Sequence, residues 1–167
     1  KIMVISTMFL FFILPIINWK ETLLSLKKTN HKTFIFILIF SFINIYFFNF
    51  LYVEGGAWGG GFFHKFSNMF FNNNFIFYIS FVLSTFIIYS VLFKKWNNYL
   101  LLILLVAFNP QFTIYNKYFD PLIYILFLTL FQLNMNKHFF EKKYKNFQLY
   151  FLSTGYLGMA LFKNYLL

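Results

Sequence analysis

Three stretches of the chain contain no charged residue and are long enough, or nearly long enough, to cross a lipid bilayer as helices. They are residues 2–18, 33–53 and 75–93. A membrane-crossing helix needs about 20 mostly apolar residues, each adding about 1.5 Å to its length. The three stretches therefore predict transmembrane helices, and Pro15 is expected to kink the end of the first one.

The composition agrees with this prediction. Hydrophobic residues make up 60% of the 167 residues and charged residues 11%, whereas a water-soluble domain carries about 25% charged residues to cover its core. The formal net charge of +10 comes from lysines alone, without arginine. Because recognition of bases and phosphates usually exploits the arginine fork, we do not expect a nucleic-acid partner.

The second half of the chain is less regular. Residues 99–115, 119–133 and 147–163 predict three further spans, so the expected fold is an all-α polytopic membrane protein with about six segments. Residues 99–133 fit either two spans or one broken, re-entrant hairpin, because Asn109 and Pro110 interrupt the apolar sequence. In the last run, Gly155 and Gly158 would permit a neighbouring helix to approach closely. We expect residues 1–167 to form one membrane domain, as a fragment of a longer protein.

The lysines indicate how such a domain would be oriented. Residues 19–32, 94–98 and 134–146 hold ten lysines, whereas the alternate connections hold only Lys65 and Lys117. Since lysine-rich short loops remain in the cytoplasm, the pattern predicts an integral membrane protein with its functional sites on the extracytoplasmic side. The positive charge would also attract anionic membrane lipid.

The connection after residue 53 is rich in glycine. Gly59, Gly60 and Gly61 can expose successive backbone N–H groups, so we predict an anion-binding loop, followed by His64 and Lys65 as substrate-binding residues. The next residues predict a short helix with its aromatic face in lipid and its polar face outside. The alternatives are a flexible turn, a solvated histidine and a lysine that reaches toward the lipid head groups.

A second polar segment, residues 109–121, lies between two prolines. Its candidate substrate-binding residues are Gln111, Lys117, Tyr118 and Asp120. The alternative is a polar turn in which Asp120 caps the following helix and Pro121 begins it. No spacing of residues indicates a metal site, a cofactor or a catalytic triad, and cysteine is absent. The catalytic residues therefore stay unknown.

The two polar segments together resemble the C-terminal membrane half of polytopic GT-C glycosyltransferases. The glycines with His64 and Lys65, and the residues from Gln111 to Pro121, are most similar to the type that transfers alpha-1,2-linked glucose to lipid-linked oligosaccharide. The resemblance implies a polyprenyl-phosphate sugar donor, whose phosphate His64, Lys65 and Lys117 would contact while Asp120 orders the loop. The early acidic loop that carries the catalytic base in the family has no counterpart here, so the missing N-terminal part of the same protein would be a partner.

The sequence thus favours a membrane glycosyltransferase fragment acting at the extracytoplasmic face. Two alternatives stay open. One is a transporter or channel subunit that binds its solute at residues 99–133. The other is a non-enzymatic membrane scaffold whose function is helix packing.

Overall fold

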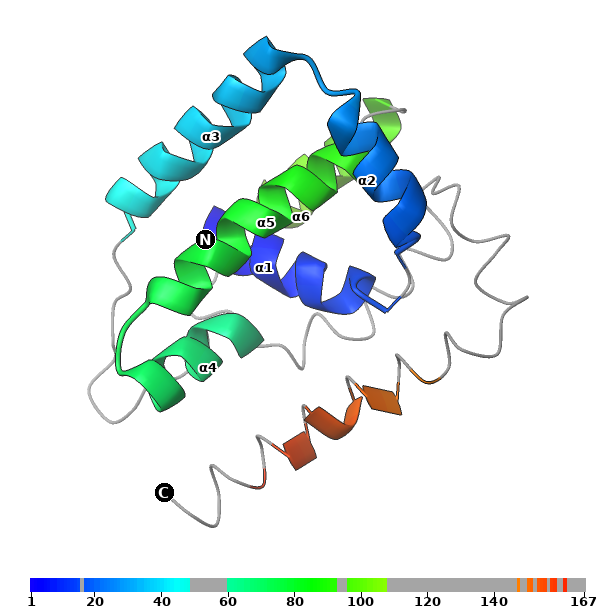
Figure 1. The fold of residues 1–167 in the computed structure, drawn as a ribbon. Helices are drawn as coiled ribbons and strands as arrows, with labels where there is room; N and C mark the ends of the chain where they lie inside the picture. The colour runs from blue at the N-terminus through cyan, green and yellow to red at the C-terminus, as the bar shows by residue number, and fades with distance from the viewer. Residues whose placement is uncertain are drawn as a thin grey trace.

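The structure is a computed structural model that describes residues 1–15, 17–48, 60–92 and 96–107, together with scattered positions between 147 and 161. All the elements assigned in the described residues are α-helices, which agrees with the all-helical part of the expectation. In chain order these are α1 (Ile2–Ile13), α2 (Trp19–Lys27), α3 (His31–Tyr46), α4 (Gly61–Phe71), α5 (Phe75–Leu92) and α6 (Trp96–Ala107) (Figure 1).

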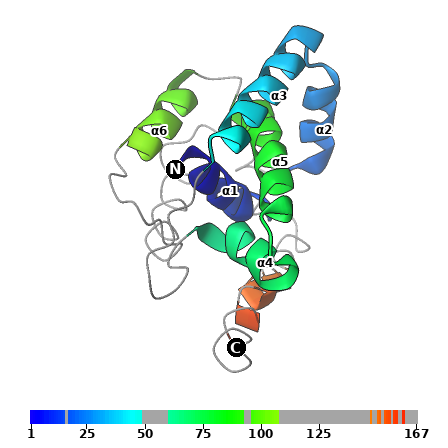
Figure 2. The same ribbon diagram turned by 90° about the vertical axis from the view of Figure 1, so that its left-hand side faces the viewer.

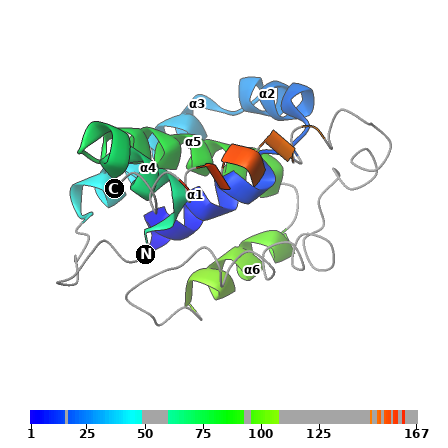
Figure 3. The ribbon, with the colours of Figure 1, turned by 90° about the horizontal axis from the view of Figure 1, so that it is seen from below.

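Helix α1 lies at the centre of the fold. Nearly all of its side chains are buried, including Phe9, which packs in the same cluster as Phe77 and Phe81 of α5. Figures 2 and 3 show α1 between α5 and α6, with α4 near one end of it. A helix that is apolar on every side must be covered on every side, and here the neighbouring helices provide much of that cover.

Short polar signals set several helix boundaries. The side chain of Asn30 accepts a hydrogen bond from the backbone N–H of Lys32, at 3.3 Å, and so caps the start of α3. The side chain of Asn73, two residues before α5, accepts a hydrogen bond of 3.0 Å from the backbone N–H of Phe75, the first residue of that helix. Pro15 follows the end of α1, where its missing N–H prevents the helix from continuing regularly.

The expectation of a polytopic protein with about six membrane spans is wrong. Among the residues that the structure describes, no helix combines the length and the apolar character that crossing a membrane requires. The run 2–18 forms only the 12-residue α1, about 18 Å long, and the run 33–53 gives an α3 that ends at Tyr46 after 16 residues.

The localisation inferred from those spans is wrong for the same reason. We expected an integral membrane protein with cytoplasmic lysine-rich loops and extracytoplasmic sites, and the described helices do not support it. Hydropathy alone does not distinguish a membrane span from a helix that other helices bury, and α1 is of the second kind.

The remaining predicted spans are only partly described. Residues 75–93 correspond to α5, and the described part of 99–115 belongs to α6. Residues 119–133, and therefore most of the predicted hairpin, lie outside the described residues. In 147–163, the described positions are helical and exposed, and a Cβ atom added at Gly155 or Gly158 would meet nothing within 4 Å. Among the described residues, no helix approaches these glycines closely.

Candidate functional site

A pocket of about 580 Å³ lies between α2, the turn that joins it to α3, and the C-terminal part of α5. This volume is within the range of small-molecule sites, about 300–1,000 Å³. Eight of its nine lining residues have polar side chains, among them one cation, one carboxylate and several hydroxyl groups, although apolar atoms of these residues make up the larger part of its surface. The lining residues are Glu21, Leu24, Ser25, Lys28, Thr29, Asn30, Thr33, Tyr89 and Ser90.

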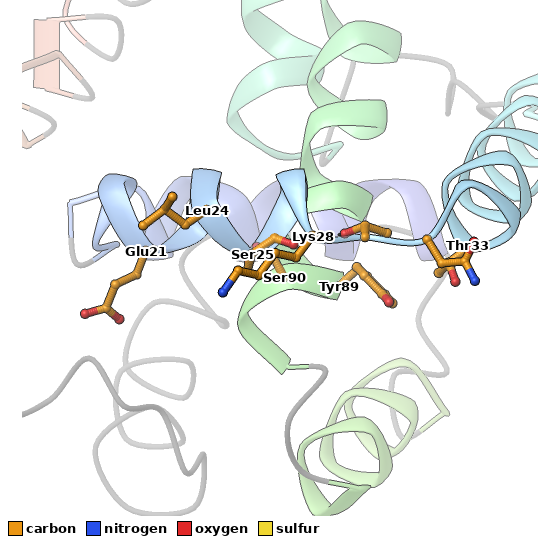
Figure 4. A pocket seen from close by; sticks show the side chains of 9 residues that line it. Glu21, Leu24, Ser25, Lys28, Thr33, Tyr89 and Ser90 are labelled. Carbon is orange, nitrogen blue, oxygen red and sulfur yellow. Dashed lines mark hydrogen bonds between the residues drawn. The ribbon is translucent and has the colours of Figure 1, made fainter.

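The spacing along α2 explains why its polar side chains meet at this pocket. Glu21, Ser25 and Lys28 are four and three residues apart, so they share one face of the helix. Figure 4 shows the side chains of Ser25, Lys28 and Ser90 close to one another, while Glu21 projects at one end and Thr33 stands at the other. Because α2 packs against α5, residues distant in sequence line the same pocket.

Hydrogen bonds orient three of the hydroxyl groups. Ser25 Oγ donates to the carbonyl of Thr22 at 2.8 Å, and Thr29 Oγ1 donates to the carbonyl of Ser25 at 3.1 Å. Ser90 Oγ donates to the carbonyl of Ile87 at 2.8 Å. A hydroxyl that donates its hydrogen to the backbone keeps its oxygen as an acceptor. The wall therefore offers acceptors for the hydroxyl hydrogens of a ligand, and Lys28 supplies a cation.

The charges around the pocket favour an anionic group near its lysine. Lys28 is exposed, and the exposed Lys27 and Lys32 stand next to the same turn, whereas Glu21 is the only acidic residue in the lining. A ligand with one anionic group and several hydroxyl groups matches this arrangement best. Leu24 adds a small apolar contact to the wall.

The predicted site at the start of α4 has a different geometry from the one expected. Gly60 and Gly61 have φ of 85° and 79°, a left-handed backbone that glycine adopts without strain, and both are buried. His64 and Lys65 follow within the same helix. Gly59, Gln111, Lys117, Tyr118 and Asp120 lie outside the described residues, so the predicted meeting of the two segments stays a prediction.

His64 is buried, with an exposed fraction of 1%. Its ring stands edge-on to Phe77, with 5.2 Å between centroids, and Asn68 Nδ2 is 3.2 Å from its Nε2. Burial lowers the pKa of His64 to about 4, and the charge of Lys65 adds to this effect. The imidazole is therefore neutral near pH 7, so it would offer a phosphate a hydrogen bond and no ion pair. Its packing fits a structural role.

The helix predicted after the glycines is confirmed as α4, but the expectation about its two faces is wrong. His64 and Ser67 are buried, whereas Phe70 and Phe71 are about half exposed. The polar side chains turn inward because partners at the α4–α5 turn satisfy them. Ser67 Oγ donates to the carbonyl of Asn73 at 2.6 Å, for example.

The sequence interpretation missed the pocket because it treated residues 19–32 as an ordinary basic connection. A signal was present in the i, i+4, i+7 spacing of Glu21, Ser25 and Lys28 between two apolar runs. The contribution of Tyr89 and Ser90, in contrast, depends on how α2 packs against α5.

Comparison with known proteins assigns neither a family nor a function to the chain. No family model matches the chain, and neither a curated protein nor a solved structure matches it.

Proposed function

We propose that the chain is part of a glycosyltransferase that uses a polyprenyl-phosphate sugar, and that the pocket between α2 and α5 holds the sugar phosphate. The observation that carries the proposal is the combination of Lys28, Glu21 and a hydroxyl-rich wall in one pocket of about 580 Å³. A glycosyl phosphate has an anionic group beside a ring of hydroxyl groups, which is the ligand chemistry that this wall matches.

Each part of the pocket has a defined task in this proposal. Lys28 pairs with the phosphate and stabilises the negative charge that grows as the phosphate leaves. The oxygens of Ser25, Thr29 and Ser90 accept hydrogen bonds from the sugar hydroxyls. Leu24 contacts the first carbons of the prenyl chain.

Glu21 serves as the general base. In the reaction, the bond between the anomeric carbon and the phosphate oxygen breaks, and the phosphate leaves with the electron pair. The acceptor hydroxyl oxygen bonds to the anomeric carbon, and its proton passes to the carboxylate of Glu21. This assignment places the acidic group in the lysine-rich segment 19–32 rather than in either segment that carries the family resemblance.

The test is binding and transfer with a short donor, farnesyl-phosphate glucose, and the purified full chain. We expect Lys28→Ala to weaken donor binding by about fivefold, the upper limit for an ion pair near the surface. Lys20→Ala is the matched control, because Lys20 is also an exposed lysine of α2 but does not line the pocket.

Glu21→Gln separates binding from chemistry. It should leave donor binding within about twofold and lower glucosyl transfer to a soluble oligosaccharide by about 100-fold or more, as expected for the loss of a general base. Donor binding that is equal in the wild-type chain, Lys28→Ala and Lys20→Ala would refute the pocket assignment.

A non-enzymatic scaffold is the second candidate, and one observation favours it. The side chains of α3 are mostly apolar and mostly exposed, as in a protein that acts by presenting a surface rather than by catalysis. This candidate predicts that substitutions in the pocket have no effect on function while substitutions on α3 abolish it. The transporter alternative depended on membrane spans, and it is not carried further.

A further inference from the structure

Helix α3 is apolar around almost its whole circumference, yet only Ile37 and Ser41 of its side chains are buried. Three of its large hydrophobic side chains are exposed by more than 60%: Phe36 by 69%, Phe42 by 64% and Tyr46 by 84%. A helix that is hydrophobic on every side is normally covered, and a large exposed apolar patch marks an interaction surface. The outer face of α3 therefore requires an occupant.

Only a narrow strip of α3 is used inside the fold. Ser41 Oγ lies 3.0 Å from Thr85 Oγ1 of α5, and the rings of Phe34 and Phe86 pack with centroids 4.9 Å apart. Figures 1 and 2 show α3 along the outer side of α5. The remaining side chains project away from this contact, and they form what we call the outer face of α3. Its exposed members are Ile35, Phe36, Ile39, Phe40, Phe42, Ile43 and Tyr46.

Charge distinguishes the two ends of this surface. Lys27 and Lys32 are exposed at the corner where α2 meets α3, and no charged residue occurs from 33 to 48. The outer face therefore begins next to lysines and continues for about 20 Å without a charge. Apolar and aromatic side chains next to lysines match an interface with anionic head groups above an acyl layer.

We propose that the outer face of α3 docks onto an anionic lipid surface without crossing it. The aromatic side chains enter the outer acyl layer, while Lys27 and Lys32 meet lipid phosphates at the head-group level. A protein partner is the poorer match, because specific protein interfaces surround their apolar centre with a polar rim and this face has polar groups mainly at its lysine end.

The docking surface goes beyond the proposed glycosyl transfer, and the apolar residues of the outer face of α3 do not line the pocket. The two are neighbours, because Thr33 at the start of α3 lines the pocket. The pocket would therefore open near the head groups, where a sugar phosphate on a prenyl chain is presented.

The test is co-sedimentation of the full chain with vesicles of phosphatidylcholine mixed with phosphatidylserine, and with phosphatidylcholine alone. The double variant Phe36→Ser, Phe42→Ser should weaken binding to both by at least about tenfold. The matched control is Phe71→Ser, Phe75→Ser, which removes two exposed phenylalanines outside α3 and should leave binding unchanged.

The lysines provide an independent readout. Lys27→Gln with Lys32→Gln should weaken binding to the mixed vesicles by about thirtyfold and to phosphatidylcholine vesicles by much less, since each lysine near an anionic surface strengthens binding by about fivefold. Because this variant keeps the apolar face intact, its effect is specific to charge.

A third variant, Phe36→Trp, keeps the helix apolar and reports insertion directly. Its added fluorescence should shift to the blue and be quenched by brominated lipid. Two results would overturn the proposal: no quenching of the tryptophan at position 36, or lipid-free self-association that Phe36→Ser, Phe42→Ser abolishes, which would make a second copy the occupant. Failure of donor binding would leave the lipid result intact, so the two proposals fail separately.

Discussion

The burial of His64 predicts that the protein loses stability as the solution becomes mildly acidic. Its pKa is about 4 in the folded chain, against 6.5 for an unperturbed histidine. Burial of the ring lowers the pKa because it removes the water that would solvate the charged form, and the positive charge of Lys65 adds to this effect. Protonation inside the fold is therefore unfavourable.

The direction and the size of this change in the free energy of unfolding follow from proton linkage. Between pH 6.5 and about 4, the unfolded chain binds a proton at His64 that the folded chain does not. The contribution of the neutral His64 to the free energy of unfolding is fully present above pH 6.5. It is lost as the pH falls, with a slope of up to about 1.4 kcal/mol per pH unit. Over the whole interval the loss amounts to about 3 kcal/mol.

The assay is urea unfolding of the wild-type chain and of His64→Gln over the interval from about pH 7.5 to about pH 4. Glutamine keeps an acceptor near Asn68 but does not titrate, so the difference in the slopes isolates His64 from the carboxylates. His31→Gln is the matched control, since His31 is an exposed histidine at the start of α3. If wild-type and His64→Gln show the same dependence on pH, the reasoning about the buried imidazole is refuted.

Four further substitutions test the packing. Ser41→Ala and Thr85→Val should each cost about 1 kcal/mol of unfolding free energy, and the double mutant should cost less than their sum, because the two hydroxyls share one hydrogen bond; urea titration of all four chains checks this. Phe81→Ala should cost about 3–5 kcal/mol by the same titration, since Phe81 is fully buried against α1. Gly60→Ala should lower the thermal midpoint, because a φ of 85° costs an alanine about 1 kcal/mol or more.

The sequence predicted where helices occur better than what covers them. The run that begins at Ile2 is helical, as expected, but its apolar side chains meet α5 and α4. Hydropathy records that a helix avoids water and does not record whether lipid or protein replaces it. The cover of α1 depends on contacts with residues far along the chain, such as Phe77, that a local pattern does not contain.

The amphipathic pattern after Gly61 failed in a similar way. It identified α4, yet it assigned the polar side chains to solvent. Asn68 Nδ2 lies 3.0 Å from Asn74 Oδ1, so the asparagines after the helix satisfy the polar side of α4 inside the fold. The polar face of a helix can point into the protein when the next turn provides hydrogen-bond partners. Only the folded structure shows which residues those partners are.

The pocket was predictable from the sequence only in part, because its walls include residues from helices far apart in the sequence. Glu21, Ser25 and Lys28 share a helical face that the sequence alone could have identified. Their meeting with Tyr89 and Ser90 depends on the packing of α2 against α5, which no spacing encodes.

The most direct measurement of the proposed function is photoaffinity labelling of the full chain with a diazirine derivative of farnesyl-phosphate glucose that carries the reactive group on the sugar. The account predicts labelled peptides from residues 21–33 and from Tyr89 and Ser90, and it predicts that unmodified farnesyl-phosphate glucose protects them. Protected labelling confined to α4 around Lys65, with residues 21–33 unlabelled, would contradict the assignment of the sugar phosphate to the pocket between α2 and α5.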